Sequence, residues 1–146
     1  TYGAMFGVFL AQKLFNKPFT IVGTGKQKRD FTYVSDVVSA IIKACNSKIK
    51  NEIFNVGSGS TVSILKIVKI LRGKKIFIKK RPGEPDITFA NISNIKRKLN
   101  WKPKIKIEEG INLMLKDIQY WKNAPVWTPS KIKKATKLWF KYLNEK

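Results

Sequence analysis

Short runs of β-forming residues that end at turn formers are the feature of this sequence that most limits its fold. Residues 19–22 end at Gly23, residues 52–56 end at Gly57, and residues 75–78 precede a basic turn that contains Pro82 and Gly83. Runs of this length and composition between turns are typical of short strands. Residues 31–34 predict one more strand. Longer amphipathic stretches separate these runs, so the chain predicts a mixed α/β fold.

The amphipathic stretches predict the helices. Apolar residues recur at helical spacing in 3–15, 36–45, 62–71, 93–99 and 108–118, and again after Thr128. Ser35 is expected to cap the second helix, and Thr128 followed by Pro129 is a strong start for a helical C-terminal tail. Cys45 is expected to be buried, as cysteine often is. No linker or repeat interrupts the pattern, so residues 1–146 predict a single lobe.

The net charge of +21 raises the question of nucleic-acid binding. A strongly basic domain gains free energy from counterion release when it meets phosphates. Among the 30 basic residues, however, arginine occurs only at positions 29, 72, 81 and 97. Arginine is the preferred reader of phosphates and base edges, and the lysines are spread along the whole chain. A lysine-rich surface is therefore the simpler interpretation, and a basic nucleic-acid-binding module remains the alternative.

The composition excludes several further classes of protein. There is no histidine, which removes the usual general base and the usual metal ligand. The single cysteine, Cys45, excludes a disulfide framework and fits a reducing compartment such as the cytoplasm. A hydrophobic content of 43% argues against a disordered chain. No apolar run approaches the ~20 residues that span a bilayer, so no membrane association is expected.

The turn Gly57-Ser58-Gly59 lies where a dinucleotide fingerprint would lie, after a strand and before a helix. The fingerprint needs a third glycine, where this chain has Val62, and an acidic residue about 20 positions later, which is missing. The only Tyr-x-x-x-Lys spacing, from Tyr142 to Lys146, falls in the predicted helical tail and away from this turn. The sequence therefore assigns no catalytic, cofactor-binding or metal-binding residue.

Two arginines are better candidates for binding. Arg29 ends a loop that holds two glycines, and Arg81 opens a Pro-Gly turn that contains Glu84. A guanidinium group binds two phosphate oxygens at once through a pair of N–H donors, and a carboxylate accepts hydrogen bonds from ribose hydroxyls. This spacing fits a grip on a nucleoside diphosphate, although an ordinary surface ion pair would have the same pattern.

The order of several motifs resembles one enzyme family. The matching segments are 18–36, 54–59, 81–85, 99–103 and 108–110. Together they resemble the C-terminal part of NAD-dependent nucleotide-sugar epimerases and dehydratases, which are extended short-chain dehydrogenases, and most of all the UDP-glucose 4-epimerases. The resemblance implies a C-terminal substrate-binding lobe without the N-terminal Rossmann part, in which the family holds NAD and the catalytic tyrosine.

The resemblance also implies roles for individual residues. Arg29 and Arg81 resemble the family's diphosphate-binding arginines, and Glu84 resembles the acidic residue that meets the ribose. Thr20 and Val22 belong to the strand that lines the base, largely through backbone groups.

Two positions depart from the family pattern. Thr24 and Asn91 each replace an aspartate that is usual there. Both lie in loops, so the departures bear on whether those loops keep the family's geometry.

The resemblance implies the sugar-nucleotide-binding part of an enzyme that acts on a nucleoside-diphosphate sugar, most simply a UDP-sugar. We expect the parent enzyme to be a cytoplasmic homodimer that uses NAD. The sequence does not distinguish epimerase from dehydratase. The chain by itself is expected to be inactive, and a truncated remnant without function is a further alternative.

Overall fold

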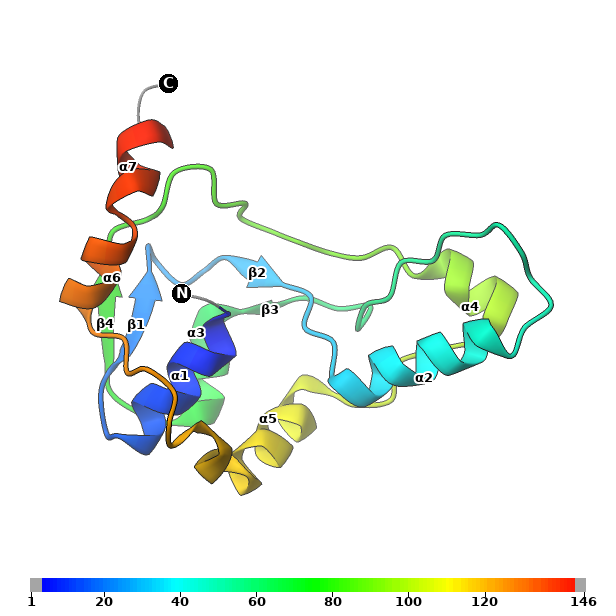
Figure 1. Ribbon diagram of the computed structural model, residues 1–146, viewed down its shortest axis with the longest axis horizontal. Helices are drawn as coiled ribbons and strands as arrows, with labels where there is room; N and C mark the ends of the chain where they lie inside the picture. Colours follow the sequence, from blue (N-terminus) through cyan, green and yellow to red (C-terminus); the bar gives the residue numbers. More distant parts are fainter. Residues whose placement is uncertain (1–3, 144–146) are drawn as a thin grey trace.

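The computed structural model describes residues 4–143 as an α/β chain (Figure 1). The strands are β1 (Phe19–Val22), β2 (Lys28–Arg29), β3 (Val62–Ser63) and β4 (Lys75–Ile78). The helices are α1 (Met5–Leu14), α2 (Val34–Cys45), α3 (Ile64–Leu71), α4 (Ser93–Leu99), α5 (Ile107–Lys116), α6 (Pro129–Ala135) and α7 (Lys137–Leu143), with a 3₁₀ turn, η1, at Ile118–Trp121. The predicted α/β class, with short strands and a helical tail, is confirmed.

Two small sheets organise the main body. β1 and β4 pair in parallel, with Phe19 opposite Lys75 and Val22 opposite Ile78. All four residues of β1 are buried, whereas β4 is largely exposed. β2 and β3 form a two-residue antiparallel pair. β1 therefore carries the interior of the body, and its C-terminal end opens toward the loop that leads into β2.

The main hydrophobic core lies between α1, β1, α3 and α5. A buried polar side chain, Gln12, joins three parts of it. The Gln12 amide donates hydrogen bonds to Thr20 Oγ1 (2.9 Å) and to the Trp127 carbonyl (2.7 Å). Its own oxygen accepts from the Thr20 N–H at 3.2 Å. Because every bond of this amide is made inside the protein, it fastens helix, strand and C-terminal segment to one another.

A second, smaller core forms an arm that contains α2 and α4 (Figure 1, right). Its buried members are Ala40, Ile92, Ile95, Leu99 and Trp101. Extended segments join the arm to the main body. The resemblance predicted a single lobe, and within that lobe the described residues pack around two separate cores.

One side of α2 carries large apolar side chains that the described part of the chain leaves exposed. We call Val34, Val38, Ile41 and Ile42 the α2 apolar face; their spacing places them along one side of the helix. Ile53, which follows α2 in the chain, is 90% exposed. The predicted strand at 52–56 is not formed, because no strand among residues 4–143 pairs with this segment.

Three other local predictions are wrong. The strand predicted at 31–34 is not formed, because the ladder of β2 stops at Arg29 and α2 already begins at Val34. Ser35 is not a cap, since α2 begins at Val34, two residues earlier than predicted, and Ser35 lies inside its first turn. Cys45 is exposed, because it lies at the end of α2 beyond the small core of the arm.

Two helix starts illustrate capping by hydroxyl groups. The Thr128 hydroxyl accepts from the Lys131 N–H and Pro129 follows it, as predicted. α3 begins at Ile64 instead of Val62, because Val62 and Ser63 pair with β2. The Ser63 hydroxyl then caps α3 by accepting from the Lys66 N–H.

Candidate functional site

Two adjoining cavities lie near the C-terminal end of β1. The first, which we call the arginine cavity, has a volume of about 260 Å³ and is lined by α1, β1 and the side chains of Arg29, Arg81 and Glu84. The second, the loop cavity, has a volume of about 320 Å³ and lies between the 22–28 loop and residues 80–87. Val22, Gln27 and Glu84 line both cavities. The two spaces therefore form adjoining parts of one site.

The two candidate arginines converge on one carboxylate. Arg29 Nη2 lies 3.2 Å from Glu84 Oε1. Arg81 Nε lies 3.2 Å from Glu84 Oε2, and Arg81 Nη2 lies 3.3 Å from Oε1. All three side chains are less than a fifth exposed, at 19%, 19% and 17%. The cluster holds two cations and one anion, so it can accept a further anion at a cavity wall.

Backbone pairing brings these residues together. Residues 86–88 run beside β2: the Lys28 N–H donates to the Asp86 carbonyl (2.8 Å), and the Thr88 N–H donates to the Lys28 carbonyl (3.1 Å). The turn from Arg81 to Glu84 lies just before this paired segment, and Gly83 adopts a φ of +71°, which glycine accommodates readily. The turn is thereby placed against Arg29.

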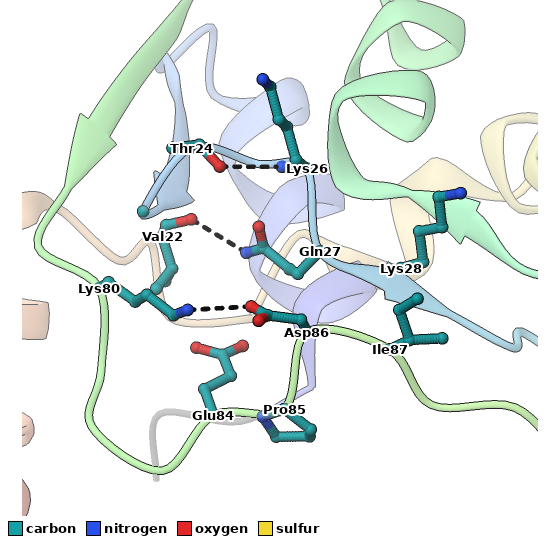
Figure 2. Close-up of a pocket in the computed structure, with 11 residues that line it drawn as sticks. Val22, Thr24, Lys26, Gln27, Lys28, Lys80, Glu84, Pro85, Asp86 and Ile87 are labelled. Atoms are coloured by element: carbon teal, nitrogen blue, oxygen red, sulfur yellow. Dashed lines mark hydrogen bonds and ion pairs between the residues drawn. The ribbon is translucent and has the colours of Figure 1, made fainter.

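Thr20 and Val22 lie on the floor of the arginine cavity. Thr20 is buried, and its hydroxyl and N–H are both engaged by Gln12. Val22 lines both cavities, and its carbonyl accepts a hydrogen bond from Gln27 Nε2 at 2.9 Å (Figure 2). β1 thus contributes a rigid, mostly apolar surface, and the Thr20 side chain serves the core.

The two positions that depart from the family pattern still form local turns. The Thr24 hydroxyl accepts from the Lys26 N–H at 3.4 Å. The Asn91 side-chain oxygen accepts from the Ser93 N–H at 3.0 Å, at the start of α4. Short polar side chains of this kind stabilise turns by bonding to the backbone two residues on, as aspartate does. Both substitutions therefore keep the local bond.

The loop cavity contains polar residues that sequence reasoning missed (Figure 2). The Lys80 ammonium lies 2.9 Å from Asp86 Oδ1. This hydrogen bond and the positive charge of Lys80 lower the pKa of Asp86 below its ordinary value. Gln27 lies in the same loop as Val22 and bonds back to the Val22 carbonyl. Each of these two contacts forms within a single loop, and no motif in the sequence marks them.

A second missed residue lies in the C-terminal tail. Trp139 Nε1 donates a hydrogen bond to the Pro82 carbonyl at 3.0 Å. The guanidinium carbon of Arg81 lies 5.3 Å from the centre of the Trp139 ring. No motif signals this contact, since the two residues belong to distant segments of the chain.

The Gly57-Ser58-Gly59 turn does not fit a dinucleotide. A Cβ at Gly57 would lie 2.6 Å from the Ala90 Cβ and 2.7 Å from Asp30 Oδ2, so this glycine serves close packing within the protein. The Ser58 N–H, which a phosphate would need, already donates to Asp30 Oδ1 at 2.7 Å. Residues 4–143 therefore offer no cradle for NAD at this turn.

The described residues contain neither a cluster of metal ligands nor a membrane-spanning helix. Between residues 4 and 143, no three His, Cys, Asp or Glu side chains gather as metal ligands would. Over the same residues, none of the helices combines the length and the apolar character that crossing a bilayer requires.

Solved structures of similar proteins share this fold. A UDP-glucuronic acid 4-epimerase from Bacillus cereus, solved with UDP-glucuronic acid and NAD, is 33% identical with a TM-score of 0.75 over 80% of this chain and 40% of that one. A UDP-glucose 4-epimerase from Thermotoga maritima, solved with UDP-glucose, is 30% identical with a TM-score of 0.72 over 83% of this chain and 40% of that one. The fold thus defines part of an extended short-chain dehydrogenase of the epimerase/dehydratase type.

The sequence comparisons give the family. The model described as GDP-mannose 4,6 dehydratase matches residues 8–114, and the chain belongs to this family. A UDP-glucuronate 4-epimerase from Thermodesulfobacterium geofontis is 38% identical over 102 residues, which are 65% of this chain and 31% of that protein. A putative UDP-glucose 4-epimerase from Methanocaldococcus jannaschii is 38% identical over 110 residues, which are 71% of this chain and 35% of that protein. The chain spans about a third of the length of the curated relatives it matches.

Proposed function

We propose that this chain forms the sugar-nucleotide-binding side of an NAD-dependent epimerase or dehydratase that acts on a nucleoside-diphosphate sugar. A UDP-sugar is the ligand we favour, because similar solved enzymes hold UDP-glucuronic acid or UDP-glucose. The observation that carries the proposal is the convergence of Arg29 and Arg81 on Glu84 at the wall of one cavity.

Each residue of the cluster has a role in this proposal. Arg29 and Arg81 bind the diphosphate, for which planar guanidinium groups offer paired donors. Glu84 balances their charge while the site is empty. When the diphosphate takes its place, Glu84 is released to accept hydrogen bonds from the ribose hydroxyls. Thr20 and Val22 line the base through the surface of β1.

The remaining chemistry belongs to other parts of the enzyme. NAD is bound in similar solved enzymes, where it would supply the hydride acceptor, and the described residues of this chain do not cradle it. The chain alone therefore binds nucleotide without turnover. We propose further that the parent is a homodimer in the cytoplasm, the location that the free thiol of Cys45 favours.

Nucleic-acid binding is less well supported. Arg29 and Arg81 are less than a fifth exposed and are engaged with Glu84 inside the cavity. Lysine then supplies nearly all of the outward-facing charge, and lysine lacks the fork that reads phosphates and bases bidentately.

The test is isothermal calorimetry of this chain with UDP and UDP-glucuronic acid. Arg29→Ala and Arg81→Ala are each expected to weaken binding by about 1.5–3 kcal/mol, because each removes a charged hydrogen-bonding partner. Arg97→Ala is the matched control, since this exposed arginine lies on α4 in the arm and bonds to Asn94. Binding that survives the loss of both cavity arginines unchanged would disprove the proposal.

A further inference from the structure

The C-terminal helix α7 rests on the segment that follows β4 (Figure 1). Two consecutive aromatic residues make the contact. Phe140 lies beneath Lys79, with 5.2 Å from the ammonium nitrogen to the ring centre, and Trp139 lies beneath Arg81. The family model matches only residues 8–114, so the match does not extend to these residues.

The Trp139 ring and Glu84 both contact the guanidinium group of Arg81. The ring centre lies 5.3 Å from the guanidinium carbon, within the range of a cation–π interaction. Glu84 receives hydrogen bonds from Nε and Nη2. The indole N–H of the same tryptophan donates to the Pro82 carbonyl, so Trp139 also fixes the backbone next to Arg81.

An open space beside Arg81 gives the contact with Trp139 a structural role. A cavity of about 530 Å³ lies between β4, α6 and α7, and Arg81 is one of its lining residues. Close packing does not fill that side of the arginine. The tryptophan ring therefore adds a contact to the guanidinium beyond its hydrogen bonds with Glu84.

We propose that Trp139 is a positioning residue for nucleotide binding, which acts through Arg81. This inference rests on the proposed function of the cluster. A diphosphate that displaces Glu84 exchanges one hydrogen-bonding partner of Arg81 and leaves the tryptophan ring in place. Trp139 thus keeps the guanidinium pointing at the site in both the empty and the occupied state.

A spectroscopic test examines the contact without any ligand. The chain has arginine only at positions 29, 72, 81 and 97, so the Nε–Hε region of a ¹⁵N spectrum is simple, and Arg81→Lys identifies the Arg81 signal. Trp139→Leu is expected to remove the ring-current shift of that signal and to speed its exchange with water. Trp139→Phe keeps an aromatic ring and retains part of the shift. Leu138→Ala, at a 64% exposed position of the same helix, leaves the signal unchanged.

The binding test uses UDP with the same variants. Trp139→Leu is expected to weaken binding by about three- to tenfold, the size of a partly exposed cation–π interaction, and Trp139→Phe by less than about threefold. Leu138→Ala leaves the affinity unchanged. Trp139 is itself 41% exposed, so its replacement leaves the core intact.

The outcomes separate this proposal from the proposed function. If the chemical shift and the water exchange of the Arg81 signal are the same in Trp139→Leu as in the wild type, the positioning role is overturned, whatever the affinity for UDP. Unchanged UDP affinity in Trp139→Leu, while Arg81→Ala still weakens binding, overturns it and leaves the proposed function intact. If the wild-type chain binds no UDP, the proposed function fails, and the positioning role fails with it.

Discussion

At the scale of single residues, acidic side chains are scarce and are used to hold backbone and cations in place. The chain has 9 acidic residues against 30 basic ones. Asp30 accepts from the Ser58 and Ala90 N–H groups, and Glu84 joins two arginines. With so few acids available, each of these carboxylates fixes segments that are distant in sequence.

Asp86 offers a prediction about pH. Its hydrogen bond with Lys80 lowers its pKa below the ordinary 3.8. A carboxyl whose pKa is lowered by folding stabilises the protein above its ordinary pKa, and this stabilisation is lost as the pH falls through the lowered value. Lys80→Met is expected to raise the pKa of Asp86 toward 3.8, as measured by carboxyl ¹³C NMR.

The Glu108 carboxyl is the control for that titration. Its pKa is also lowered, in this case mainly by a hydrogen bond from Lys66 at a distant surface. Glu108 should titrate identically in the wild type and in Lys80→Met. An Asp86 pKa that does not move would show that Lys80 is not its main partner in solution.

At the scale of elements, a single carboxylate ties the arm to the main body. Asp36, in the first turn of α2, is buried and accepts hydrogen bonds from the Lys104 and Ile105 N–H groups, both at 3.0 Å. These two residues lead into α5, which packs on the main core. Asp36 thus fixes where α2 leaves the body.

Asp36→Ala is expected to lower the free energy of unfolding by about 2–4 kcal/mol, because two buried N–H groups lose their acceptor. Asp36→Asn keeps one acceptor oxygen and should lose roughly half as much. Urea denaturation followed by tryptophan fluorescence measures both. Asp117→Ala removes an exposed acid whose side chain caps no N–H, and it should leave the free energy of unfolding nearly unchanged. Equal stability of Asp36→Ala and wild type would contradict the prediction.

Local sequence predicted the Thr128 cap and the bounds of β1 and β4, and it failed for the Ser35 cap and for the strand at 52–56. Thr128-Pro129 marks a helix start because capping is decided within four residues. Residues 52–56 have strand composition and no strand neighbour in the described chain, so composition alone was misleading. A strand requires a partner with free backbone groups, and local composition does not supply one.

Some residues of the candidate site could be predicted from the sequence and others could not. Arg29, Arg81 and Glu84 were chosen from motifs, and the structure places them together, while their role in binding stays a prediction. Trp139 could not be chosen, because its contact with Arg81 depends on how the C-terminal helices return to β4. Sequence motifs identify candidate binding residues. They do not identify the residues, distant in sequence, that hold those side chains in position.

At the scale of the whole molecule, surface charge and the α2 apolar face have opposing effects. Like charges on a chain of +21 repel one another and keep molecules apart. Exposed apolar side chains such as Ile41 and Ile42 favour association. Salt weakens the first effect, with a Debye length of about 8 Å at physiological ionic strength, and leaves the second in place.

We therefore expect this chain to be monomeric at low salt and to self-associate as salt is added. The double variant Ile41→Glu/Ile42→Glu should stay monomeric across the same range, as measured by analytical ultracentrifugation. Tyr120→Glu, which also adds an acid at an exposed position away from α2, should associate like the wild type. Association that persists in the double variant would place the contact elsewhere on the surface.

The shared carboxylate between the two arginines has a consequence for how such a site works. Glu84 already sits against both guanidinium groups. On the proposed function, a diphosphate would therefore enter by competition with Glu84. The affinity for the diphosphate would then reflect the difference between its interaction free energy with the two arginines and that of Glu84. Glu84 would also speed product release, because it re-forms its ion pairs with the two arginines as the product dissociates. On the proposed function, competition from Glu84 favours rapid exchange of the nucleotide over tight retention.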